Sequence, residues 1–153
     1  MRIFRSYLIS IIILAVISLC SILYIARHIP TQLVLRNNRA LWNSQHFQHY
    51  RYIFTPSCLC PFESVQVDVQ NGVVTSITRV SDGQAEPIAR YKNFAPIEQL
   101  FGLIEQELRA RVLWVAVSYD PLHGYPQQID VRYRGYGSED SSSFSVTDFE
   151  VVN

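Results

Sequence analysis

The sequence lacks the short motifs that mark several large classes of enzyme. It contains no glycine-rich phosphate-binding loop, no Gly-x-Ser-x-Gly nucleophile elbow and no His-Glu-x-x-His zinc motif. These absences exclude the common NTPases, serine hydrolases and zinc proteases that carry those motifs. Cysteine is also scarce, with three in 153 residues. We therefore expect a non-enzymatic protein, and we predict no cofactor.

Acidic residues are absent from the first 62 positions. Residues 1–62 carry six arginines and no Asp or Glu, whereas residues 63–153 carry seven basic and thirteen acidic residues, a net charge of 7 − 13 = −6. Nucleic-acid-binding domains need a basic face, so the acidic C-terminal part excludes a nucleic-acid partner. The basic N-terminal part suits a segment near anionic lipid headgroups.

Charge is absent from residues 7–26 as well, in the run YLISIIILAVISLCSILYIA. A helix rises 1.5 Å per residue, so about 20 apolar residues span the ~30 Å hydrocarbon core of a bilayer. We expect residues 1–29 to be an uncleaved membrane anchor. A cleaved signal peptide ending at Cys20 and a lipoprotein signal at the same cysteine are the alternatives. The apolar run continues beyond Cys20, which disfavours both.

Arginines flank this apolar run on both sides, so the positive-inside rule is nearly balanced. The long domain follows the first and only span, as in a signal anchor. We therefore expect the N-terminus in the cytoplasm. The C-terminal domain is then outside the cytoplasmic membrane, in the bacterial periplasm or at the cell exterior.

Three segments follow from these patterns: the anchor, a membrane-proximal stem helix over residues 30–47, and an extracytoplasmic domain over residues 48–153. The apolar stripe of the stem is thin, with Val34, Leu41 and Trp42 at helical spacing. The third segment is long enough for one domain with its own core. Its fold class is predicted as α+β, a mainly antiparallel sheet of about six strands packed against one or two helices.

Alternation of apolar and polar residues predicts most of the strands. It marks an aromatic strand at 50–55 and a valine-rich hairpin around Asn71-Gly72. A three-residue turn, Gln70-Asn71-Gly72, pairs Val67 with Thr75 and Val65 with Ile77. That register gathers the apolar residues on one face, so we expect it in preference to a two-residue turn.

The second half of the domain shows a helix and three further strands. Pro96 suits a helix start, and apolar residues then recur at helical spacing through Leu108. The apolar run 112–119 is typical of a central strand covered on both faces. Strands are also predicted at 128–134 and 144–151, the last with a bulge near Thr147-Asp148 where the apolar phase switches. Glu105 and Glu107 are expected on a solvated helix face.

The most distinctive short motif is Cys58-Leu59-Cys60-Pro61. Two cysteines this close form a strained, easily reduced disulfide ring in an oxidising compartment. Reduced thiols are a second interpretation. A metal site is a third, with His46 and His49, three residues apart, as additional ligands suited to zinc or copper.

A second motif, Tyr119-Asp120-Pro121-Leu122-His123-Gly124-Tyr125-Pro126, is rich in turn residues. The plainest interpretation is a shaped loop between two strands. The functional interpretation is a binding loop that displays His123 and Tyr125 on a rigid turn, with Asp120 as the third candidate residue.

The order of these features resembles an uncharacterised bacterial family of small extracytoplasmic domains that are lipid-anchored or membrane-anchored. The resemblance covers residues 40–151. Its motifs are Tyr50-Arg51-Tyr52, the Cys-x-Cys-Pro and Tyr-Asp-x-x-x-Gly-Tyr-Pro patterns, Asn71-Gly72-Val73-Val74 and Gln99-Leu100-Phe101. It implies the compartment and the fold, and no activity.

Three functions compete on this evidence. The first is an interaction or accessory module of the cell envelope, anchored in the membrane through residues 7–26 and bound to an envelope protein. The second is a metal- or redox-responsive domain that uses Cys58 and Cys60. The third is a small-molecule binder with a cleft between sheet and helix.

Overall fold

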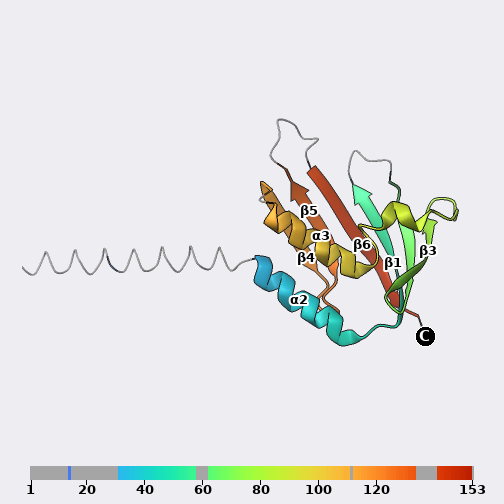
Figure 1. The fold of residues 1–153 in the computed structure, drawn as a ribbon, viewed down its shortest axis with the longest axis horizontal. Helices are drawn as coiled ribbons and strands as arrows, with labels where there is room; N and C mark the ends of the chain where they lie inside the picture. The colour runs from blue at the N-terminus through green and yellow to red at the C-terminus, as the bar shows by residue number, and fades with distance from the viewer. Residues whose placement is uncertain (1–13, 15–30, 58–61, 111, 134–140, 153) are drawn as a thin grey trace, which may run out of the picture. The chain divides into compact units, whose positions relative to one another are not determined.

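The computed structural model describes residues 14, 31–57, 62–110, 112–133 and 141–152. They form a six-stranded antiparallel sheet of order β3-β2-β1-β6-β5-β4 and two α-helices (Figure 1). The predicted α+β class with an antiparallel sheet is confirmed. The elements are α2 (Thr31–Gln45), β1 (His49–Ser57), β2 (Val65–Gln70), β3 (Val73–Arg79), the 3-10 helix η1 (Ile88–Tyr91), α3 (Ile97–Arg109), β4 (Trp114–Tyr119), β5 (Pro126–Arg132) and β6 (Ser141–Val151).

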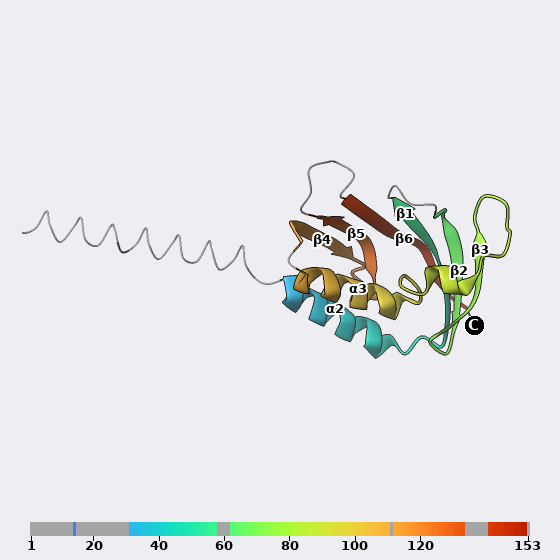
Figure 2. The same ribbon diagram turned by 45° about the horizontal axis from the view of Figure 1, so that its top comes forward.

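Both helices lie side by side on one face of the sheet (Figures 1 and 2). The alternation of β1 turns its aromatic residues to that face, where Tyr50, Tyr52 and Phe54 are buried. The predicted α3 helix starts at Ile97, directly after Pro96. Its apolar stripe packs onto the sheet, and the core therefore lies between the helices and the sheet. The buried stripe consists of Ile97, Leu100, Phe101 and Ile104.

The helix predicted over residues 30–47 is present as α2 (Thr31–Gln45), with a different buried stripe. Leu35 and Trp42 are buried, whereas Val34 is exposed. The chain divides into two compact units, Met1–Val34 and Leu35–Asn153, so most of α2 belongs to the same unit as the sheet. No described helix is long and apolar enough to cross a membrane. Apart from Leu14, the predicted span at 7–26 lies outside the described residues.

The register predicted for the β2–β3 hairpin is wrong. Gln70 pairs with Val73, so the turn has two residues, Asn71 and Gly72, both with positive φ. An irregularity after Val74 then shifts the register and pairs Val67 with Ile77. The shift inside the strand, and not the turn, brings Ile77 to the buried face opposite Val67. Of the apolar residues of β3, only Val73 is left exposed.

The bulge predicted in the last strand is confirmed. Arg51 pairs with Glu150, but Ile53 pairs with Thr147, so β6 has one extra residue at this point. Asp148 adopts a φ of 50° there. The bulge turns Phe149 to the helix-covered face, where it packs against the core.

Two predictions for the second half of the domain are wrong. The run 112–119 forms β4, which lies at the edge of the sheet and not at its centre. The strand that joins the two halves of the sheet is β6, which pairs with β1. Because successive side chains of β4 point to opposite faces, Val115 packs on the core side and Trp114 is exposed. Glu107, expected in solvent, is 8% exposed and accepts a hydrogen bond from the Tyr133 hydroxyl at 3.2 Å.

Candidate functional site

The two histidines of the predicted metal set do not lie in one secondary-structure element. Helix α2 ends at Gln45, and His46 follows with a φ of 52°. His49 starts β1, and its Nε2 lies 2.7 Å from the Asp68 carboxylate. Cys58 and Cys60 lie outside the described residues. Within the described ranges, no three His, Cys, Asp or Glu side chains group as metal ligands, and the cysteine chemistry stays a prediction.

Asp120 builds the turn that follows β4. Its Oδ1 accepts hydrogen bonds from the backbone N–H groups of Leu122 and His123, at 3.0 and 2.7 Å, and lies 3.0 Å from Nδ1 of His123. Its Oδ2 accepts from the Gln127 amide. This pattern is an Asx-type turn, and it uses both carboxylate oxygens for structure.

Tyr125 is not displayed by this turn, contrary to the sequence prediction. Only 6% of its surface is exposed, and its ring lies 4.9 Å from Phe149 and 6.2 Å from Trp42. Gly124 explains the inward direction, since its φ of 81° lets the loop approach α2 closely. His123 stays partly exposed. Whether these residues bind a partner stays a prediction.

The turn completes a group of rings that we call the aromatic cluster. It joins the end of α2, the start of β1, the turn after β4 and the end of β6, with ring centroids between 4.9 and 6.4 Å apart. Such tilted and edge-to-face contacts add to the stabilisation from burial. The cluster consists of Trp42, Phe47, Tyr50, His123, Tyr125 and Phe149.

A carboxylate that the sequence analysis did not select lies beside this cluster. Glu98 accepts a hydrogen bond from Nε1 of Trp42 at 2.9 Å on one oxygen, and from the Tyr50 hydroxyl at 3.1 Å on the other. Burial and the nearby Glu98 charge raise the pKa values of Tyr50 and Tyr52. Among the described residues, no Lys or Arg pairs with Glu98.

Glu98 lines a pocket of about 200 Å³ together with Trp42, Asn43, His46 and Phe47. The only sequence signal for Glu98 was an acidic residue in the first turn of a helix, which the helix dipole already explains. Its hydrogen-bond donors are 48 and 56 positions away. Nothing local in the sequence therefore marks this pocket.

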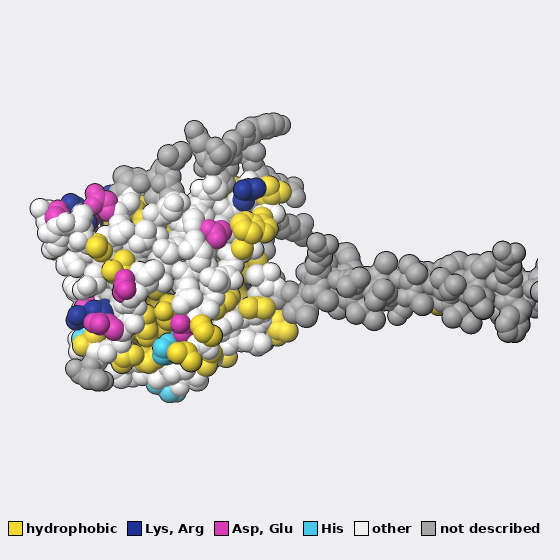
Figure 3. Space-filling view, turned by 180° about the vertical axis from the view of Figure 1, so that it is seen from behind, with side chains coloured by type: hydrophobic (Ala, Val, Ile, Leu, Met, Phe, Trp, Pro, Cys, Tyr) yellow, Lys and Arg dark blue, Asp and Glu magenta, His cyan; other side chains and the backbone are white. Residues whose placement is uncertain are grey.

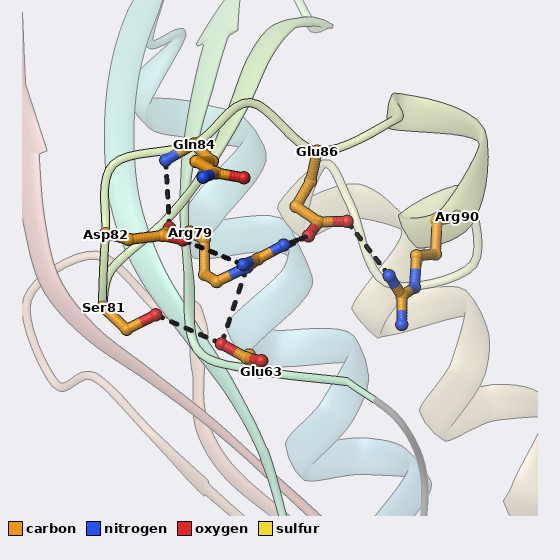
Figure 4. Close-up of polar contacts among 7 residues, drawn as sticks. All are labelled: Glu63, Arg79, Ser81, Asp82, Gln84, Glu86 and Arg90. Carbon is orange, nitrogen blue, oxygen red and sulfur yellow. Dashed lines mark hydrogen bonds and ion pairs between the residues drawn. The ribbon is translucent and has the colours of Figure 1, made fainter.

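The two edges of the sheet differ in how they are protected. At the β3 edge, the following loop folds back: Arg79 N–H donates to the Gln84 carbonyl and Glu86 N–H to the Ile77 carbonyl. Side chains hold the loop there, since Arg79 contacts Glu63, Asp82 and Glu86 (Figure 4). The hydrogen bond from Arg79 keeps the pKa of Glu86 below its usual range.

No such cover lies along β4 in the described part of the chain. Its sequence, Trp-Val-Ala-Val-Ser-Tyr, has no charge and no proline, although natural edge strands commonly carry these residues to prevent pairing. Leu113 and Trp114 are 57% and 51% exposed. Seen from behind, hydrophobic side chains gather on the side where β5 and β4 lie (Figure 3).

No curated protein and no solved structure matches this chain. One family does match, over residues 34–151, a range that includes the aromatic cluster, the Glu98 pocket and both sheet edges. The chain therefore belongs to a family of unknown function, DUF6174.

Proposed function

We propose that this chain is a membrane-anchored, non-enzymatic interaction module of the bacterial cell envelope. In this proposal, residues 7–26 hold the protein in the cytoplasmic membrane and the domain lies outside it. The domain captures an extended segment of an envelope protein, which pairs with β4 as a seventh strand. The observation that carries the proposal is the bare, uncharged β4 edge, with Trp114 at its start and Leu113 directly before it both exposed.

Edge pairing suits β4 because backbone hydrogen bonds supply affinity while side chains supply specificity. In the antiparallel register Trp114 lies opposite Arg132, on the face of the sheet away from the helices. Val115 and Val117 lie on the other face, packed against the core. An added strand would therefore place alternate residues beside Trp114 and beside the end of the core.

The charge of the domain favours a partner segment over a second copy. Residues 63–153 carry a net charge of 7 − 13 = −6, so two copies repel each other at close range. We expect a β-branched or aromatic segment with Lys or Arg residues flanking it. The turn residues Asp120 and His123, by contrast, are engaged in the Asx turn.

Site-specific photo-cross-linking in intact membranes tests the proposal. A photoreactive amino acid is placed at Trp114 or Ser118 of the full-length chain, and at Val73 on the opposite edge as the control. Strand pairing requires that the two β4 positions cross-link to one segment of an envelope protein, at residues four apart. Cross-links to a second copy, or no β4 cross-link above the Val73 level, would contradict it.

Two matched substitutions, each of which places a lysine on one edge of the sheet, extend this test. Trp114→Lys places a cation on the pairing edge, and we expect it to lower the cross-link yield from the probe at Ser118 at least tenfold. Val73→Lys changes an apolar residue on the β3 edge that is also more than half exposed, and it should leave that yield unchanged. Equal effects of the two substitutions would argue against recognition by β4.

Protease treatment of spheroplasts tests the orientation separately. If the domain lies outside the cytoplasmic membrane, external protease removes it without cell lysis. Protection of the domain in intact spheroplasts, with digestion only after lysis, would refute the proposed localisation.

A further inference from the structure

The Glu98 pocket combines one carboxylate with aromatic walls. Glu98 supplies the charge and the half-buried Phe47 supplies ring surface, while the buried Trp42 contributes its N–H edge and Asn43 and His46 complete the lining. A carboxylate has about four acceptor positions, and the hydrogen bonds from Trp42 and Tyr50 use one on each oxygen. The carboxylate is therefore fixed in direction and has acceptor capacity left.

The donors that fix this carboxylate are both neutral. An indole N–H and a phenol O–H orient Glu98 without cancelling its charge. The nearest acidic neighbour on the same helix, Glu105, is different because it pairs with Arg39 and Arg109. Within the described residues, Glu98 has no such ion pair, so no Lys or Arg offsets its negative charge in the pocket.

A fixed negative charge beside an aromatic ring is the chemistry that recognises organic cations. Ammonium groups are attracted to an aromatic face, here that of Phe47, and to a carboxylate at the same time. A volume of about 200 Å³ accommodates an ammonium head with a short substituent. We infer that this pocket binds a small organic ammonium group, free or as a lipid headgroup.

This inference uses a different surface from the β4 edge and does not depend on the proposed partner. A bound cation would contact Glu98 and Phe47 beside the buried Trp42, between the N-terminal end of α3 and the C-terminal end of α2. Because Trp42 is one of two tryptophans, Trp114→Phe leaves its indole as the only tryptophan fluorophore beside the pocket. Occupancy is then measured directly on the full-length chain in detergent.

The probes are choline and its uncharged isostere 3,3-dimethylbutan-1-ol, compared at constant ionic strength. We expect a saturable change in Trp42 fluorescence with choline, and an affinity at least tenfold weaker for the isostere. Equal responses to the two probes would overturn the inference, as would the absence of a saturable response to choline together with no response to phosphatidylcholine discs. This comparison uses the unmodified pocket and does not depend on the folding of a pocket variant.

Substitution of Glu98 then tests whether its charge causes the preference for choline. Glu98→Gln keeps the side-chain shape and an acceptor oxygen, and we expect it to remove the tenfold preference for choline. Glu105→Gln, on the same helix and outside the pocket, should leave the preference intact. A preference that survives Glu98→Gln in a folded variant, judged by circular dichroism, would also overturn the inference.

The source of the ammonium group is distinguished with nanodiscs. Discs of phosphatidylglycerol with added choline test the free ligand, and discs containing phosphatidylcholine without added choline test the headgroup. A fluorescence change in the first arm assigns a soluble cation, and a change only in the second assigns a lipid. No change in either arm would refute the site.

Discussion

Replacement of Gly124 by alanine is the sharpest test of how the turn after β4 is packed on α2. Gly124 has a φ of 81°, a conformation that L-residues rarely adopt. A Cβ added here would lie 2.5 Å from the backbone oxygen of Asn38, and 3.1 and 3.2 Å from Cβ and Cγ of Leu41. The carbonyl is part of the helix backbone, so the turn and α2 would have to separate.

The expected cost has two parts. The left-handed conformation costs an alanine about 1–2 kcal/mol, and forcing extra volume into a packed contact adds about 1–3 kcal/mol. Gly83→Ala provides the control, because Gly83 also has a positive φ, of 71°, but nothing lies within 4 Å of the added atom. It should show the first part alone, so the two variants should differ by about 1–3 kcal/mol.

Urea titration of both full-length variants in the same detergent, followed by tryptophan fluorescence, gives the free energies of unfolding. The slope of the transition should stay constant, so that the shift in midpoint reports stability. If Gly124→Ala costs no more than Gly83→Ala, the turn is not pressed against α2 and the explanation for the buried Tyr125 fails.

Three further predictions concern single groups in the domain. Tyr52→Phe should raise the free energy of unfolding by about 1 kcal/mol, because the buried Tyr52 hydroxyl has no partner among the described residues. Tyr50→Phe should lower the free energy of unfolding by about 1.5–3 kcal/mol, because it removes the hydrogen bond to the Glu98 carboxylate. Equal urea midpoints for the two variants would be inconsistent with this assignment. The pKa of Glu86 is lowered from 4.5 in the folded state, so its stabilisation is present above pH 4.5 and is lost as the pH falls through the folded value; Glu86→Gln should flatten that acid limb of a stability–pH profile, and an unchanged limb would argue against the ion pair. If Cys58 and Cys60 form a disulfide, neither thiol should react with an alkylating reagent before reduction and both should react after it, as mass spectrometry will show.

Local patterns predicted many of the elements correctly. The alternating valines gave β2, and the alternating aromatics gave the inward face of β1, because successive side chains of a strand point to opposite faces. Pro96 followed by a 3.6-residue period gave α3. The phase switch near Asp148 gave the bulge in β6, since one extra residue reverses which face is buried.

The errors arose where distant segments decide the environment. The apolar run of β4 predicts a central strand, because its sequence resembles strands covered on both faces. Strand order is set instead by long-range pairing: β6 pairs with β1, which leaves β4 at the edge of the sheet. Tyr125 was expected in solvent because turns commonly display their residues, and only the close approach of Gly124 to α2 places it in the core.

The sequence by itself determined the acidic C-terminal part, the apolar N-terminal run and the local periodicity of the strands and helices, because charge, hydrophobicity and side-chain direction are properties of neighbouring residues. Tertiary structure alone decided the bare β4 edge and the pocket beside Glu98. Both depend on segments separated by tens of residues, as the 56-residue separation of Trp42 and Glu98 shows. Only chain folding brings an indole, a phenol and a carboxylate into hydrogen-bonding distance.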